Sequence, residues 1–202
     1  MFIMGSNFPR ERHAIIILFA LCSEFYMLIS KALIGKAEVC IQHLRKRNLK
    51  VSFAESCTGG LLSFVFSCVP GVSDVLFSSV VVYKTHSKCV VLEVPQREIE
   101  KYGVVSEQVA GMMAEGALRA LGHHADIVLS VTGTAGHAVH GTEPVPPDPE
   151  TGTVYMGLAR RNSRVKVRRY DLGCITRFEV QEAAVEKAID FIEMAIFPDG
   201  AS

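Results

Sequence analysis

The sequence lacks net charge, and it lacks the cysteine spacing of a metal site. Its 202 residues include 21 Lys and Arg and 21 Asp and Glu, so no overall basic field is available to attract nucleic acid. Six cysteines occur without a Cys-x-x-Cys pair, and their spacing suits neither zinc nor a small disulfide framework. We therefore expect a reduced, cytoplasmic chain with no nucleic-acid partner and no metal site.

A long apolar run is also missing. Residues 14–22 are apolar and follow two arginines, as in a signal peptide, but this run is too short to span a bilayer and Glu24 interrupts it. We expect residues 1–30 to be an extension that arises from an upstream start codon or forms a helix packed on the domain. Export is the alternative, and stable membrane insertion is not expected. Residues 31–198 then form one domain.

Segments with helical and strand periodicity alternate along this domain. The apolar spacing predicts a helix over residues 31–47, and the alternation at 50–54 predicts a strand half-exposed to solvent. Further on, the sequence predicts a helix at 58–68, a buried strand at 75–83, short helices from about 87 and at 96–102, a strand at 126–131, strands at 153–159 and 164–172, and a helix at 177–196. This order predicts an α/β fold, a three-layer α/β/α sandwich with a mixed sheet that includes an antiparallel hairpin.

Three local signals support these element boundaries. Ser106 is expected to cap a helix, and Thr176 with Glu179 forms a capping box before the last helix. The short polar segment 161–163 is typical of a hairpin turn. Residues 137–151 contain four prolines and few apolar residues, so they are expected to form a loop.

The most informative segment is Ala54-Glu-Ser-Cys-Thr-Gly-Gly60, which lies between the first predicted strand and the next helix. A strand-to-helix turn can lift a nucleophile out of the sheet edge and aim backbone N–H groups at a ligand. Ser56, Cys57 and Thr58 are the candidate nucleophiles. The N–H groups of Thr58, Gly59 and Gly60 are the candidate donors to an oxyanion or a phosphate.

A serine nucleophile needs a base, and the residues alone leave its identity open. None of the seven histidines lies in a motif that pairs with a Gly-x-Ser-x-Gly turn, which this segment is not. A buried lysine can act as base when burial lowers its pKa, and Lys88 could reach Ser56 from the end of the second strand. An ordinary surface lysine, a Ser-His-Asp triad and a nucleophilic Cys57 remain alternatives.

Two further groups of residues are candidates for binding an anion. Thr132, Gly133 and Gly136 form a second turn of small residues after the strand at 126–131. Arg177 lies in the first turn of the last helix, where a guanidinium can bind a phosphate or a carboxylate with two hydrogen bonds. Either feature could equally be an ordinary turn or a surface residue.

Several ordered motifs resemble the CinA C-terminal domain family, whose members also occur alone as nicotinamide-nucleotide amidases. The resemblance covers about residues 31–197. It is carried by Ala54-Glu-Ser-Cys-Thr-Gly-Gly60, Gly71-Val-Ser-Asp-Val-Leu-Phe77, Val80-Val-Val-Tyr83 with Lys88, Gly103-Val-Val-Ser-Glu107, Thr132-Gly-Thr-Ala-Gly136 and Gly152-Thr-Val-Tyr155.

The resemblance implies an amidohydrolase that converts nicotinamide mononucleotide to nicotinate mononucleotide and ammonia in NAD recycling. It implies a catalytic dyad of Ser56 and Lys88 and no metal or organic cofactor. Its partner would be a small pyridine nucleotide, and a homo-oligomer is compatible with the family. The implied substrate-binding residues are Thr58, Gly59, Gly60, Ser73, Tyr83, Thr132, Gly133 and Arg177.

The sequence departs from the family pattern at three places. Thr85 replaces a usual Asn, the segment 137–141 replaces a glycine- and proline-rich stretch, and the segment before Arg177 is one residue longer. These changes leave the dyad intact but bear on substrate affinity. The alternative hypothesis is therefore a catalytically weak nucleotide-binding or interaction domain, followed by an amidase for another small amide.

Overall fold

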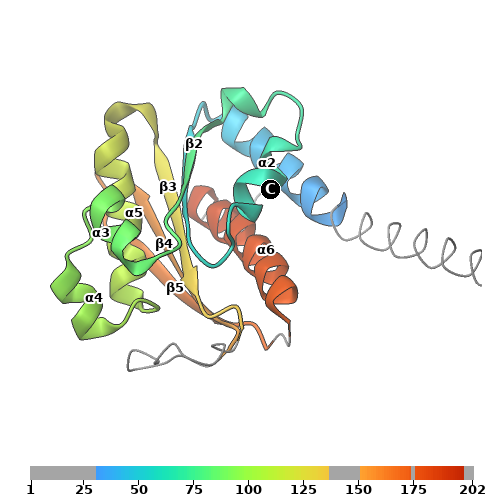
Figure 1. Ribbon diagram of the computed structural model, residues 1–202. Helices are drawn as coiled ribbons and strands as arrows, with labels where there is room; N and C mark the ends of the chain where they lie inside the picture. The colour runs from blue at the N-terminus through green and yellow to red at the C-terminus, as the bar shows by residue number, and fades with distance from the viewer. Residues whose placement is uncertain (1–30, 137–150, 174–175, 198–202) are drawn as a thin grey trace, which may run out of the picture. The chain divides into compact units, whose positions relative to one another are not determined.

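The computed structural model describes residues 31–136, 151–173 and 176–197 (Figure 1). The chain divides into a unit Met1–Ala32 and a unit Leu33–Ser202, and the second is described here. After a helix over residues 33–46, its elements are β1 (Val51–Glu55), α2 (Leu61–Ser67), η1 (Val72–Asp74), β2 (Leu76–Val81), α3 (Thr85–Leu92), α4 (Gln96–Tyr102), α5 (Glu107–Leu121), η2 (Gly122–His124), β3 (Ile127–Gly133), β4 (Thr153–Arg160), β5 (Lys166–Asp171) and α6 (Arg177–Ile196).

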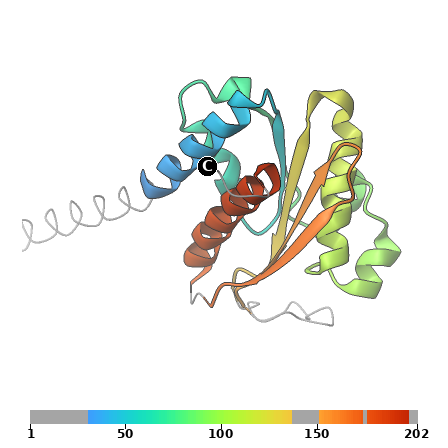
Figure 2. The ribbon, with the colours of Figure 1, turned by 180° about the vertical axis from the view of Figure 1, so that it is seen from behind.

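One mixed sheet forms the middle layer, with the strand order β2-β1-β3-β4-β5. β1 runs parallel to both of its neighbours, β2 and β3, whereas β4 runs antiparallel to both of its neighbours, β3 and β5. The helix over residues 33–46, α2 and α6 pack into one apolar cluster, and α3, α4 and α5 pack into a second. Figures 1 and 2 show α6 on one face of the sheet and α3 to α5 on the other. The predicted three-layer α/β/α fold with a mixed sheet is confirmed.

The first strand corrects the sequence prediction, because β1 is not half-exposed. All five of its residues are buried between β2 and β3. Its polar residues find partners inside the protein, since Ser52 accepts a hydrogen bond from Ser78 Oγ at 3.2 Å and Glu55 accepts several from the following turn. The polar alternation therefore reflected internal hydrogen bonds rather than contact with water.

The second strand corrects the prediction in the opposite direction. β2 was expected to be buried, but it is an edge strand whose residues alternate between partly buried and exposed positions. Phe77 and Val81 are exposed. A run rich in apolar β-formers does not by itself distinguish an edge strand from a central one.

Helix α2 begins at Leu61 rather than at the predicted residue 58. The backbone of Gly59 has φ +63° and that of Gly60 has φ +102°, a left-handed region that residues with a side chain rarely adopt. These two glycines turn the chain before the helix can start. Their presence is thus required by the backbone, whatever they contact.

The predicted caps of α5 and α6 and the predicted hairpin turn are confirmed. The side chain of Ser106 accepts a hydrogen bond from Val109 N, and Thr176 with Glu179 forms the reciprocal capping box. β4 and β5 are joined by a tight turn in which Asn162 has a positive φ. Most of the predicted loop, residues 137–150, lies outside the described residues.

Helix α5 packs unusually close to α3 at one glycine. A Cβ atom built on Gly116 would lie 1.9 Å from the carbonyl oxygen of Leu92, so a side chain there would force the two helices apart. Gly35, on the exposed face of the first helix, would meet nothing within 4 Å. The two positions therefore provide a matched pair for testing this packing.

We expect Gly116→Ala to lower the free energy of unfolding by about 1–3 kcal/mol because of overpacking. Gly35→Ala should raise it by about 0.5–1 kcal/mol, because alanine loses less backbone entropy than glycine in a helix. Urea denaturation followed by circular dichroism measures both values. Equal stability of the two variants would contradict the close contact.

Candidate active site

The carboxyl ends of three parallel strands meet at one edge of the sheet. Ser56 follows β1, Tyr83 follows β2 by two residues, and Gly133 ends β3. The helices that follow β1 and β2 pack on opposite faces of the sheet. Ligands of open α/β sheets bind where the chain diverges in this way, beyond the carboxyl ends of the strands.

At this edge the Ser56 hydroxyl contacts the Lys88 amine. Lys88 lies on α3, and its Nζ donates to Ser56 Oγ at 3.0 Å and to the carbonyl oxygen of Val82 at 2.8 Å. The side chain of Lys88 is fully buried, and Ser56 is 8% exposed. The Ser56 hydroxyl on the turn after β1 and an amine 32 residues later are thus within hydrogen-bond reach.

Burial changes the chemistry of Lys88. It lowers the pKa of this lysine to about 8, although the nearby sulfurs of Cys57 and Cys89 act in the opposite direction. No carboxylate in the described segments forms an ion pair with Lys88. A substantial neutral fraction is therefore present just above neutral pH, and the neutral amine can donate to Val82 while its lone pair accepts the proton of Ser56.

The other candidate nucleophile on the turn is in a different environment. Cys57 is buried in the apolar cluster beneath α6, and this burial raises the pKa of its thiol to about 12. The reactive form of cysteine is the thiolate, so the environment of Cys57 disfavours a nucleophilic role. Of the hydrogen bonds to Ser56 Oγ between described side chains, the one observed comes from Lys88 rather than from a histidine.

Two of the three backbone amides that the sequence predicted as ligand donors have acceptors inside the protein. Gly59 N donates to the carbonyl oxygen of Ser56 at 3.1 Å, and Gly60 N donates to the Glu55 carboxylate at 2.9 Å. These two amides, expected as ligand donors, are therefore already occupied. The amides of Cys57 and Thr58 have no oxygen acceptor within the described segments.

Two residues that hold this turn were missed by sequence reasoning. The carboxylate of Glu55 accepts hydrogen bonds from Thr58 Oγ1 and from amides at the start of α2. Gln181 on α6 donates from Nε2 to the carbonyl oxygen of Cys57 at 2.9 Å. A carboxylate placed six residues before a helix start could have suggested the first contact. No local signal could have suggested Gln181, which lies 124 residues from its partner.

Tyr83 and Arg177 meet at the same edge of the sheet. Arg177 Nη1 donates to Tyr83 Oη at 3.2 Å, and both side chains are exposed. A Cβ atom on Gly136 would lie 3.4 Å from Arg177 Nη2, so the turn after β3 lies against this guanidinium. The structure thus brings together three segments that are distant in the sequence.

Thr132 and Gly133 have structural partners at this edge. Thr132 is buried and donates from Oγ1 to the carbonyl oxygen of Val104 at 3.1 Å. A Cβ atom on Gly133 would approach the carbonyl oxygen of Thr153 to 2.8 Å, so the close pairing with β4 explains this glycine. Neither contact involves Ser56 or Lys88.

Ser73 lies beyond the amino ends of the parallel strands, at the end of the sheet opposite to Ser56. It belongs to η1, which precedes β2, and Val75 in turn accepts a hydrogen bond from Val51 at the start of β1. Because β1 and β2 are parallel, at least about 15 Å of strand separates Ser73 from Ser56. Within one chain, Ser73 is therefore not part of the Ser56 site, in contrast to what the motif resemblance implied.

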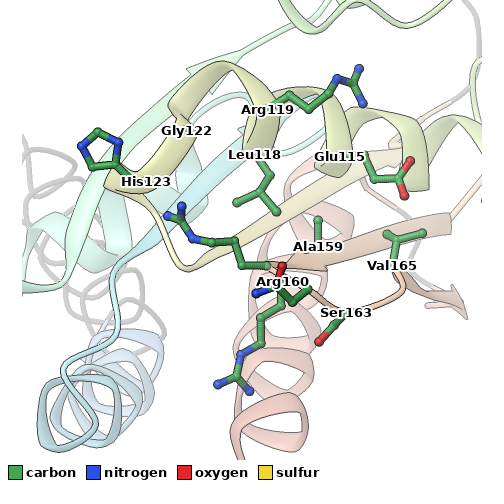
Figure 3. Close-up of a pocket in the computed structure, with 11 residues that line it drawn as sticks. Glu115, Leu118, Arg119, Gly122, His123, Ala159, Arg160, Ser163 and Val165 are labelled. Carbon is green, nitrogen blue, oxygen red and sulfur yellow. The ribbon is translucent and has the colours of Figure 1, made fainter.

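A cavity of about 560 Å³ lies elsewhere, between the C-terminal half of α5 and the β4–β5 turn (Figure 3). His123 and Ser163 lie at opposite ends of it in Figure 3, and the side chain of Arg119 points away from it. These groups do not converge on a common point. The cavity therefore offers no paired nucleophile and base, and the contact between Ser56 and Lys88 defines the candidate active site.

The described residues contain no group of three or more His, Cys, Asp or Glu side chains that could hold a metal ion. No helix among them is long and apolar enough to cross a membrane.

The fold and this site define a three-layer α/β/α domain with a hydroxyl and a buried amine at the carboxyl edge of its parallel strands. The family model of the CinA C-terminal domain matches residues 34–196, and the chain belongs to this family.

Relatives and solved structures of this family are similar to the chain to different extents. A CinA-like protein of Kosmotoga olearia is 37% identical over 161 residues, which are 80% of this chain and 37% of that protein. A putative competence-damage inducible protein of Caldicellulosiruptor saccharolyticus is 37% identical over 79% of this chain and 36% of its own length. The chain thus spans little more than a third of these relatives.

Among solved structures, a competence/damage inducible protein of Agrobacterium tumefaciens matches with a TM-score of 0.71 and 31% identity. The match covers 81% of this chain and 94% of that one. A CinA superfamily protein of Klebsiella pneumoniae has a TM-score of 0.73 at 24% identity, over 81% and 97% of the two chains, and this likeness supports the fold alone.

The lowered pKa of Lys88 predicts a pH dependence of stability. Between about pH 8 and 10.5, the folded lysine has lost its proton while the unfolded one retains it, so raising the pH stabilises the folded state. Relative to Lys88→Met, the wild type should gain roughly 3 kcal/mol across this window. Urea denaturation at pH 7.5 and pH 10.5 measures the difference, and a constant difference would contradict the lowered pKa.

Proposed function

We propose that this chain is an amidohydrolase that converts nicotinamide mononucleotide to nicotinate mononucleotide and ammonia, in the recycling of NAD in the cytoplasm. The observation that carries the reaction class is the 3.0 Å contact between buried Lys88 Nζ and Ser56 Oγ. The choice of substrate rests on the family resemblance of the sequence motifs. No organic cofactor or metal is needed for this reaction.

In the proposed mechanism, Ser56 Oγ attacks the carboxamide carbon while neutral Lys88 takes the hydroxyl proton. The tetrahedral intermediate then breaks its carbon–nitrogen bond, and Lys88 returns the proton to the departing ammonia. A water molecule attacks the resulting ester, with Lys88 again accepting a proton. The carboxylic acid is released and the Ser56 hydroxyl is restored.

The amides of Cys57 and Thr58 are the proposed donors to the oxyanion. Both lack an oxygen acceptor within the described segments, whereas the amides of Gly59 and Gly60 are occupied. The amide that follows a nucleophile on a strand-to-helix turn is a common oxyanion donor. Removing one such donor typically costs about 10²–10³ in rate.

The phosphate of the nucleotide is proposed to bind near Tyr83 and Arg177. Both side chains are exposed and linked by a 3.2 Å hydrogen bond. A guanidinium can bind a phosphate with two hydrogen bonds, and the hydrogen bond to Tyr83 would hold the Arg177 guanidinium in place. Thr132 and Gly133, beside Ser56 at the end of β3, would line the same site.

Ser56→Ala should lose at least about 10³-fold in kcat for ammonia release from nicotinamide mononucleotide. Lys88→Met should lose about 10²–10⁴-fold, because it removes the general base. Coupled glutamate dehydrogenase detection of ammonia measures both rates. The exposed Ser67→Ala and Lys101→Ala are the matched controls and should retain wild-type kcat.

Undiminished activity of Ser56→Ala would exclude the serine mechanism. Tight binding of nicotinamide mononucleotide by the wild type in calorimetry, with no release of ammonia, would instead favour a nucleotide-binding domain without turnover.

The rate should also follow the protonation of Lys88. Because the neutral amine is the proposed base, kcat/KM should rise with pH and level off above an apparent pKa of about 8. A pH–rate profile between pH 6 and 10 checks this, with Ser67→Ala expected to give the same curve. A profile that is flat over this range would remove Lys88 from the role of base.

A further inference from the structure

A buried carboxylate lies directly before the proposed nucleophile. Glu55 is the last residue of β1 and is completely buried. Glutamate is rarely buried to this extent unless its charge has partners. No basic side chain of the described segments forms an ion pair with it. The groups that stabilise this carboxylate are therefore neutral donors.

Five neutral donors satisfy both oxygens of Glu55. They are Thr58 Oγ1 at 2.8 Å, Gly60 N at 2.9 Å and Leu62 N at 3.2 Å on Oε2, with Ser63 N at 2.9 Å and Ser79 Oγ at 3.2 Å on Oε1. Hydrogen bonds to a carboxylate are roughly twice as strong as those between neutral groups. This set connects β1 to the turn, to the first residues of α2 and to β2.

The amides that follow Ser56 fall into two groups because of this carboxylate. Glu55 accepts three of them, and the carbonyl oxygens of Ser56, Thr58 and Gly60 in the turn accept those of residues 59, 61 and 64. The amides of Cys57 and Thr58 alone, within residues 57–64, lack an oxygen acceptor in the described part of the chain. Both amides point toward the Cys57 sulfur and lower the pKa of its thiol, against the larger effect of burial.

We propose that Glu55 is a positioning residue for the reaction at Ser56. By fixing Thr58 and the start of α2, its carboxylate holds the turn in the shape that points Ser56 Oγ at Lys88 and leaves the amides of Cys57 and Thr58 for the oxyanion. Glu55 itself touches neither substrate nor Lys88 in this role. The inference rests on the proposed function, because it takes Ser56 as the nucleophile.

The role requires a carboxylate and not just a side chain of this shape. A carboxylate has acceptors only, and all five neighbours of Glu55 are donors. The two hydroxyls could rotate and accept from a glutamine NH₂ group, but the backbone amides cannot. In either orientation that NH₂ group would face at least one backbone N–H, Ser63 N on one side or Gly60 N and Leu62 N on the other, so the turn would have to shift. A shift of about 1 Å at a nucleophile can cost about 10² in rate.

Glu55→Gln tests this proposal in steady-state assays with nicotinamide mononucleotide. We expect kcat to fall about 10²-fold or more, KM to change by less than about threefold, and the apparent pKa of the pH–rate profile to stay near that of the wild type. A role confined to overall stability would leave kcat of the folded fraction unchanged. A kcat within about threefold of the wild type would overturn the proposal.

Glu193→Gln is the matched control for the loss of a carboxylate. Glu193 lies near the far end of α6, where Oε2 contacts His43 Nδ1 at 2.9 Å, and it has no part in the site. This variant can lose stability but should keep wild-type kcat. If Glu55→Gln does not fold, Thr58→Val removes one donor to the carboxylate and should still lower kcat several-fold. An unchanged kcat in Thr58→Val would then overturn the proposal.

A serine-reactive fluorophosphonate separates this inference from the choice of substrate. The probe forms a phosphorus–oxygen bond with Ser56 and releases fluoride, and intact mass spectrometry follows the rate. If the wild type is labelled but does not hydrolyse the nucleotide, the proposed function fails, and slower labelling of Glu55→Gln still supports the positioning role. If the wild type is labelled and Glu55→Gln is labelled equally fast, the positioning role is overturned. A wild type that is neither active nor labelled would overturn both.

Discussion

The hydrogen bonds to the Glu55 carboxylate are the constraint on which the rest of the site depends. A chain that leaves a central, buried strand and enters a helix must satisfy several amides that neither element can pair. Glu55 accepts three of these amides and the Thr58 hydroxyl. The positive φ angles of Gly59 and Gly60 allow the chain to wrap around the carboxylate. The buried carboxylate at the end of β1 thus satisfies amides that this tight turn would otherwise leave unpaired.

Burial at this site also makes it unfavourable for Lys88 to carry a charge. A lysine without a carboxylate partner resists being charged inside the protein, and the pKa of Lys88 falls to about 8 as a result. An ion pair would have stabilised the fold but would have raised that pKa and removed the neutral amine. The carbonyl oxygen of Val82 accepts a hydrogen bond from Lys88 and so orients Nζ without adding a charge. Stability at this position is exchanged for a neutral amine, which the proposed mechanism uses as its base.

The sequence predicted what is local and missed what depends on tertiary contacts. The capping residues Ser106 and Thr176 and the hairpin turn were predictable, because neighbouring residues determine them. The burial of β1 and the edge position of β2 were not, since both follow from strand order, which periodicity does not encode. The position of Ser73 was missed for the same reason, because a motif does not show at which end of a strand its residues lie. No sequence pattern indicated the contact between Gln181 and the Cys57 carbonyl.

The turn gives two adjacent side chains opposite chemical environments. A thiolate is intrinsically the better nucleophile, yet Cys57 faces the apolar cluster, where burial raises the pKa of its thiol to about 12. Ser56 faces the amine of Lys88 at 3.0 Å. The Cys57 sulfur is also near Lys88, but among the described residues the side-chain hydrogen bond of this amine goes to Ser56 Oγ rather than to the thiol. Because the carbonyl of Cys57 is held by Gln181, the two residues cannot exchange places without breaking the contact between the turn and α6. Position in the fold, rather than intrinsic reactivity, therefore favours Ser56 over Cys57 as the proposed nucleophile.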